Sequence, residues 1–129
     1  MTSFTDAERE YLAGQQLARL ATASPEGTPD VSAVRFILDG DTIISRGLDL
    51  TKTVRYRHLL VNPLATLVVD DLASLDPWKP RGVKVRGPAV IEDDDGKPRI
   101  RISPETIWSW GINEGASKRF ASIERRHLD

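Results

Sequence analysis

Alternation of apolar and polar residues with a period of two is the sequence feature that most constrains the fold of this chain. In the run VSAVRFIL (31–38), read with this period, Arg35 shares one face with three apolar residues. The Asp39-Gly40 pair that follows is the strongest hairpin signal in the chain, because both central residues of such a turn adopt positive φ. We therefore expect strands over residues 31–38 and 41–46 that pair through this turn.

Other short segments also have the composition of strands. The apolar, β-branched run LATLVVD (64–70) is typical of a strand that is buried on both faces. Pro88 marks an edge or a bulge in a later strand, because proline has no N–H to donate to a sheet. The predicted strands are 18–23, 31–38, 41–46, 64–70, 82–92 and 99–103, and residues 106–112 can extend the sheet.

Helices interrupt this series of strands. Thr5 and Glu8 match a capping box, which predicts a short helix through about Leu12. A second helix is expected over residues 51–61, and Asn62-Pro63 ends it because the residue before a proline disfavours helical geometry. Both helices are short compared with the strand content of the chain.

The chain of 129 residues has the usual length of one domain. Residues 72–80 are expected to form a long loop, and the polar tail from Asn113 a short helix or a disordered segment, with 117–129 flexible. These elements predict a mainly β fold with short helices. We expect a six-stranded antiparallel barrel that is closed or half-closed and spans residues 1–129.

Composition excludes several kinds of site. The chain has no Cys and two His, which rules out disulfides, thiolate chemistry and most zinc sites, so we expect no metal. A formal net charge of −1 argues against a protein built to bind nucleic acid. The N-terminus is acidic where a signal peptide would be basic, and no 18-residue apolar run is present. We therefore expect a cytoplasmic protein that does not cross a membrane.

A local basic segment stands out from this balanced charge. The chain leaves a strand at Ser45 and Arg46, crosses a loop that contains Gly47, and enters the second helix. Lys52 and Arg55 are three residues apart, which places them on one face of that helix. Free amides and the positive end of the helix dipole attract anions, so these cations would complete a phosphate site. A surface helix with ordinary salt bridges is the alternative, and these residues alone leave both open.

Aromatic residues and one histidine are further candidates. Trp78, Trp108 and Trp110 can stack on a flat heterocycle, but such side chains more often belong to a core or an interface. His58 is a candidate general base, although no partner at fixed spacing orients it. The Arg35 side chain points either into a site or out of one end of the barrel, and the sequence leaves both possibilities open.

Several segments together resemble the pyridoxamine 5′-phosphate oxidase-like split β-barrels. They are RLAT (19–22), PEGTP (25–29), and Asp39-Gly40-Asp41 followed by a strand and a basic helix that ends in Asn62-Pro63. The run DDLASLDPWKPRGV (70–83) is similar to an actinobacterial branch of this family assigned to the deazaflavin coenzyme F420, related to the reductase of oxytetracycline biosynthesis. The pattern is completed by VRG (85–87), RIRISP (99–104) and SWG (109–111), so the resemblance covers residues 5 to 112.

The resemblance implies a homodimer that binds a flavin-type cofactor in a groove at the subunit interface. Lys or Arg at the start of the inserted helix holds the cofactor phosphate in such proteins. Counted back from Asn62-Pro63, that position is Arg55, which replaces the usual Lys, with Lys52 as a second candidate. Position 58 is His where relatives commonly have Asn.

The resemblance also implies roles for four other residues. Ser45 and Arg46 end the strand that leads to the same phosphate. Arg35 belongs to the strand beneath the cofactor ring, and Trp78 to the loop that can cover the ring.

The function implied is that of an F420-dependent oxidoreductase. It would transfer a hydride between coenzyme F420 and an unsaturated small organic substrate, and the chemistry would belong to the cofactor rather than to a catalytic side chain. Water or a residue such as His58 would protonate the product. The alternatives are an FMN-binding oxidase or reductase of the same fold, and a non-catalytic flavin- or deazaflavin-binding protein.

Overall fold

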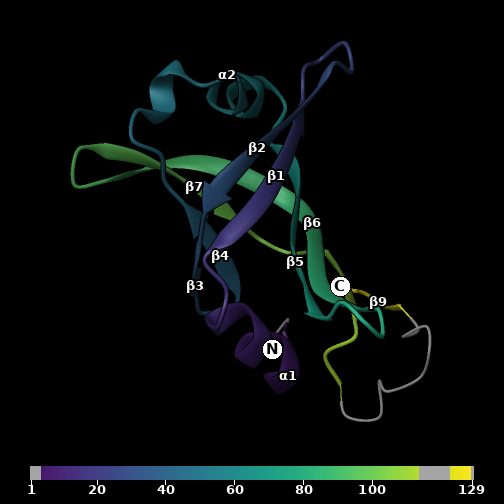
Figure 1. Ribbon diagram of the computed structural model, residues 1–129. Coiled ribbons are helices and arrows are strands. Elements are labelled where there is room, and N and C mark those ends of the chain that lie inside the picture. Colours follow the sequence, from purple (N-terminus) through teal and green to yellow (C-terminus); the bar gives the residue numbers. More distant parts are fainter. Residues whose placement is uncertain (1–3, 114–122, 129) are drawn as a thin grey trace.

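The computed structural model describes residues 4–113 and 123–128, which form nine antiparallel strands and two α-helices (Figure 1). Seven strands follow the order β2-β1-β5-β6-β7-β4-β3, and β8 pairs with both β6 and β9. The helices are α1 (Asp6–Ala13) and α2 (Val54–Val61). The strands are β1 (Leu17–Ala23), β2 (Pro29–Arg35), β3 (Ile37–Asp39), β4 (Thr42–Ser45), β5 (Leu64–Ser74), β6 (Lys79–Asp94), β7 (Lys97–Ile102), β8 (Thr106–Trp110) and β9 (Glu124–His127).

The long strand β6 belongs to both halves of the barrel. Its first part pairs with β5 and β8, and its second part, from Ala89, pairs with β7. Gly87 and Pro88 lie where the partners change, and a Cβ on Gly87 would lie 2.0 Å from the Ser103 carbonyl oxygen. Glycine permits this close approach of two backbone segments. The sequence predicts an edge or a bulge at Pro88, but this residue lies inside β6 at the end of the pairing with β5, and the register shift of that pair lies at Leu72 and Ser74 instead.

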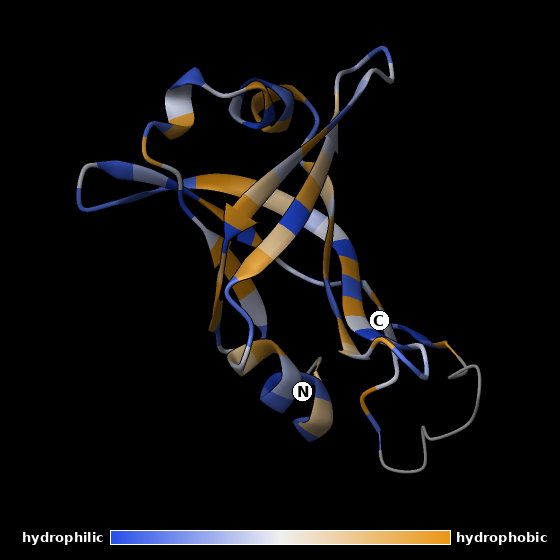
Figure 2. Ribbon diagram, in the orientation of Figure 1, coloured by the Kyte–Doolittle hydropathy of each residue, from blue (hydrophilic) through white to orange (hydrophobic). Residues whose placement is uncertain are grey.

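Alternate residues of these strands fill one apolar core. In Figure 2 hydrophobic residues follow the strands that cross the middle of the barrel, and hydrophilic residues gather at the hairpin tips. Among the described residues, no helix has the length and apolar character needed to cross a membrane. Fully buried side chains from six strands meet in the core, among them Leu20, Ile43, Leu67, Val69, Val83, Val85, Ile100, Ile102 and Ile107.

The predicted mainly β antiparallel barrel is confirmed, but the described residues contain nine strands rather than six. The predicted strand 31–38 is interrupted at Phe36, so that β2 and β3 are separate. β8 extends the sheet as expected, and residues 124–127 of the predicted helical or disordered tail form β9. The rest of the predicted flexible tail, residues 117–122 and 129, lies outside the described residues.

Three other sequence predictions are corrected by the structure. The long loop expected over 72–80 is wrong, because β5 extends to Ser74 and β6 begins at Lys79, leaving a short turn. The second α-helix begins at Val54 rather than at 51, and a separate 3₁₀ turn spans 50–52. The run 64–70 is not buried on both faces, since Leu64, Thr66 and Val68 stay at least partly exposed.

An ion pair between a buried carboxylate and a partly exposed arginine joins the two ends of the described chain. The predicted capping box of α1 is present, with the Thr5 amide donating to the Glu8 carboxylate at 2.9 Å. Arg126 of β9 donates to the same carboxylate at 2.6 Å and 3.0 Å. Burial by itself would raise the pKa of Glu8, but the hydrogen bonds from Arg126, Thr5 and Ser109 outweigh it and lower the pKa.

Glu8→Gln removes the negative charge that Arg126 contacts. We expect this substitution to lower the free energy of unfolding at neutral pH by about 2 kcal/mol, the usual contribution of a hydrogen bond to a charged group. Glu10→Gln, an exposed change in the same helix, should have no measurable effect. Urea denaturation measures the free energy of unfolding of both variants. An equal loss in Glu8→Gln and Glu10→Gln would contradict a stabilising role for the ion pair of Glu8 with Arg126.

Acid should remove the difference between wild type and Glu8→Gln. Folding lowers the pKa of Glu8, so its contribution is complete above the unfolded-state pKa and is lost as pH falls through the folded-state pKa. Urea denaturation at a series of acidic pH values tests this. A stability difference between the two proteins that grows on acidification would show that folding does not lower the pKa of Glu8.

Candidate functional site

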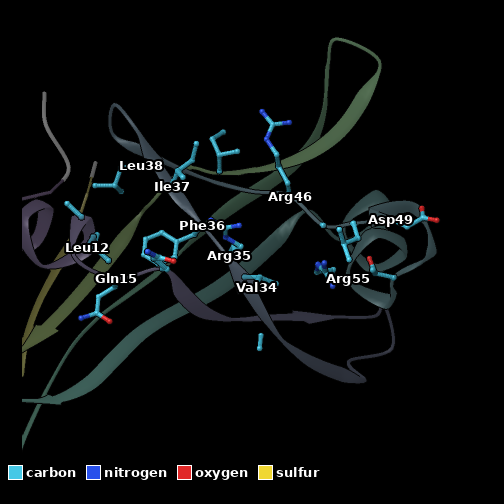
Figure 3. Close-up of a pocket in the computed structure, with 17 residues that line it drawn as sticks. Leu12, Gln15, Val34, Arg35, Phe36, Ile37, Leu38, Arg46, Asp49 and Arg55 are labelled. Carbon is cyan, nitrogen blue, oxygen red and sulfur yellow. The ribbon is translucent and has the colours of Figure 1, made fainter.

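A groove of about 930 Å³ runs between the two helices along the outside of the barrel. Its floor is formed by the end of β2 and by β3, and one end is closed by the last turn of α1 and the residues that follow it. The other end is formed by the loop after β4 and the start of α2 (Figure 3). Leu12, Phe36 and Leu38 make the α1 side apolar, and arginines gather near α2.

Arg55 lies at the α2 end of the groove. Its Nε is buried and has no hydrogen-bond partner in the part of the chain that the structure describes. Burial lowers the pKa of Arg55, and the nearby Asp30 carboxylate partly opposes this effect. Buried polar groups are nearly always hydrogen-bonded in folded proteins, so an unsatisfied arginine nitrogen beside a groove indicates a binding position for an anion.

The backbone around Arg55 provides the space for this side chain. Gly47 lies beside it, and a Cβ on Gly47 would be 2.8 Å from the Arg55 Nη2 atom. Thr53, which also lines the groove, caps α2 by accepting a hydrogen bond from the Tyr56 amide at 3.2 Å. The positive end of the helix dipole therefore lies beside Arg55.

Two of the other predicted residues line the groove and a third supports it. The Arg35 side chain is exposed at the end of β2, and Arg46 follows β4 and forms an ion pair with Asp94. The Arg46 guanidinium lowers the pKa of Asp94. Ser45 is buried, and its hydroxyl donates to the Arg35 carbonyl oxygen at 3.0 Å, so it joins β4 to the end of β2.

Lys52 and Trp78 do not line the groove. Lys52 lies in the 3₁₀ turn before α2, is mostly exposed, and forms an ion pair with Asp49 at 3.3 Å. The expected shared helix face of Lys52 and Arg55 is wrong, because only Arg55 belongs to α2. Trp78 is 60% exposed in the turn between β5 and β6. Its role as a cover of the cofactor ring stays a prediction, as does phosphate binding by Lys52.

Among the described residues that line the groove, Asp49 is the one candidate general acid or base. His58 lies outside its lining, where Nδ1 is 2.9 Å from the hydroxyl oxygen of the buried Thr22. Asp49 is held by the ion pair with Lys52 and accepts a hydrogen bond from Thr51 at 3.0 Å. Residues 4–113 and 123–128 also contain no cluster of His, Asp or Glu that could hold a metal ion. The arginines and the apolar side chains of the lining together suit an anion attached to an apolar group.

Two features of the groove were not predicted from the sequence: the wall that α1 contributes, and the space that Gly47 leaves for Arg55. Gln15 and Leu12 are far in sequence from the basic segment, and no local pattern indicates that they lie beside β3. The helix start at Thr53 did carry a local signal, because threonine is a preferred N-cap residue.

Comparison with known proteins gives the family. The family model described as "Pyridoxamine 5′-phosphate oxidase" matches residues 4–121. The chain belongs to this family. A relative, the 5a,11a-dehydrotetracycline/5a,11a-dehydrooxytetracycline reductase of Streptomyces rimosus, is 34% identical over 119 residues, which cover 84% of each protein. The resemblance drawn from the sequence is confirmed for the family and for this reductase.

Solved structures confirm the fold of the family. A conserved hypothetical protein from Mycobacterium tuberculosis has a TM-score of 0.72 at 17% identity, over 87% of this chain and 88% of that chain. The FAD binding protein from Mycobacterium smegmatis has a TM-score of 0.64 at 20% identity, over 81% of this chain and 91% of that chain. At these identities the likeness concerns the split barrel alone.

Gly47→Ala tests whether the Arg55 pocket binds an anion. The added methyl group displaces the flexible end of Arg55 and no backbone, so the melting temperature without ligand should stay close to that of wild type. Pyrophosphate should raise the melting temperature of wild type, because a ligand that binds only the folded state stabilises it. The variant should show a smaller rise in a thermal-shift titration. An equal rise in both proteins would place the anion elsewhere.

Proposed function

We propose that this chain is an F420-dependent oxidoreductase that transfers a hydride between coenzyme F420 and an unsaturated organic substrate. The observation that carries the proposal is the buried, unsatisfied Nε of Arg55 at the cationic end of a groove whose other end is apolar. The reductase activity named for the Streptomyces rimosus relative supports an oxidoreductase. The cytoplasm predicted from the sequence remains part of this proposal.

The residues of the groove fit a cofactor that has a phosphate and a flat ring system. Arg55 and Arg46 would hold the phosphate, since a guanidinium donates two parallel hydrogen bonds to such a group. Phe36 and Leu38 offer apolar surface for the ring and exclude water from it, and Arg35 lies between the two regions. When bound, the deazaflavin supplies the hydride, so the protein needs to provide binding and orientation.

FMN is the second candidate cofactor. It also carries a phosphate, so the same arginines fit it, and the fold is shared with an FAD binding protein. A cofactor-binding protein without turnover is the third candidate. An oxidoreductase loaded with its cofactor would reduce an activated double bond, whereas a cofactor-binding protein without turnover would not.

Titration of the apoprotein with F420 and with FMN, followed by fluorescence, tests the cofactor. We expect F420 to bind at micromolar concentration and more tightly than FMN. Arg55→Gln should weaken F420 binding by about 1.5–3 kcal/mol, the range for a hydrogen bond to a charged group. Arg57→Gln, an exposed change in the same helix that does not line the groove, is the matched control. Tighter binding of FMN, or no effect of Arg55→Gln, would overturn the assignment.

We also propose that the protein is a homodimer, as the resemblance implies. An exposed strip on the outer face of β1, β2 and β3 supports this, with Leu17, Val31 and Ile37 at 49%, 65% and 58% exposure. The same face carries the small residues Ala21 and Ala33, and Arg19, which is held by an ion pair with Asp70. Arg35 shares this face and also lines the groove, so a second copy on the strip would wall the cofactor site.

Val31→Glu should convert the dimer to a monomer, because it places a charge at the most exposed of the three large apolar side chains of this strip. Val90→Glu is the matched control, since Val90 is 45% exposed on β6 and lies outside this strip. Sedimentation equilibrium measures the mass of both variants and of wild type. A monomeric wild type, or a Val31→Glu variant that remains dimeric, would contradict the proposal.

A further inference from the structure

A second group of cations surrounds one tryptophan ring at the opposite end of the sheet from α2. Trp108 of β8 lies across from Lys84 of β6 on one side and from Arg125 of β9 on the other. The Lys84 Nζ lies 4.3 Å from the ring centroid, and the Cζ atoms of Arg86 and Arg125 lie at 5.1 Å and 5.9 Å. Figure 1 shows β9 far from α2, and no residue of the cofactor groove belongs to this cluster.

These three cations lack acidic partners within the described ranges 4–113 and 123–128. Ion pairs there hold most other arginines, including Arg19 with Asp70 at 2.7 Å on the same sheet. Lys84, Arg86 and Arg125 contact the indole instead, and no carboxylate of the described residues lies within 4.0 Å of their nitrogens. Like charges on neighbouring positions of a sheet repel each other, so an anion placed among them would be stabilised.

An apolar groove of about 520 Å³ adjoins the cluster. It is lined by Trp108 and Trp110 together with Pro80, Ile123 and Lys84. The Trp110 ring lies against the backbone of Gly82, where a Cβ would be 2.4 Å from the Trp110 Cζ2 atom, so glycine is required for this ring position. The groove therefore combines indole and aliphatic surface with a cationic rim.

We propose that the Trp108 cluster and this groove form a second binding site, for an organic anion with a flat ring, such as an aromatic carboxylate. The ring of the ligand lies in the groove against Trp110, Pro80 and Ile123, and its carboxylate contacts Lys84 and Arg125. Inorganic anions lack the apolar part, and neutral aromatic compounds lack the charge. The site does not depend on the identity of the cofactor, because the two grooves share no lining residue.

Isothermal titration calorimetry with 2-naphthoate tests this site, with 2-naphthalenemethanol as the neutral analogue and phosphate as the anion without a ring. Naphthoate should bind wild type more tightly than either compound. Lys84→Gln and Arg125→Gln should each weaken naphthoate binding about threefold to tenfold. Lys97→Gln removes one charge at the exposed tip of the β6–β7 hairpin and should leave binding unchanged. Arg55→Gln should also leave naphthoate binding unchanged, since Arg55 belongs to the other groove.

Four results would overturn the proposal. They are no detectable binding of naphthoate at millimolar concentration, equal affinity for the neutral analogue, equal affinity for phosphate, and the same loss of affinity in Lys97→Gln as in Lys84→Gln. Circular dichroism during thermal unfolding verifies that each variant is folded, so that a loss of binding reports on the site.

Discussion

Closure of the barrel depends on the change of partners in β6 at Gly87 and Pro88, where this strand leaves β5 and β8 and joins β7. The second part of β6 supports the groove beside Arg55, because β7 pairs with β4 and the Ser45 hydroxyl at the end of β4 donates to the Arg35 carbonyl oxygen. The first part holds β8 and the cations around Trp108. One strand thus determines the positions of both grooves.

Local sequence patterns predicted most of the strands, but they could not supply contacts between distant segments. The hairpin of β5 and β6 extends through residues expected to form a loop, because Arg81 and Asp71 pair across it with an Nε to Oδ1 distance of 2.6 Å. The start of α2 is defined by the hydrogen bond that the Tyr56 amide donates to the Thr53 hydroxyl. The periodicity of the sequence alone does not predict this start. The basic end of the groove was predictable from residues close in sequence, whereas the wall that includes Gln15 arises only when α1 folds against the barrel.

The described residues that line the groove include arginines, apolar side chains and one carboxylate, Asp49, which is held by Lys52. In the proposed function such a groove would bind and orient a phosphate-bearing ring system and exclude water from it, and a hydride transfer requires these effects of the protein. Burial of the Arg55 Nε without a hydrogen-bond partner costs free energy. A bound anion that accepts a hydrogen bond from this atom would remove that cost.

A crystal structure of the protein with bound F420 would show whether the groove beside Arg55 holds the cofactor. We expect the cofactor phosphate to lie between the Arg55 and Arg46 side chains beside Gly47, with the ring system directed toward Phe36 and Leu38. A phosphate bound outside this groove, or one that makes no contact with Arg55, would contradict this expectation.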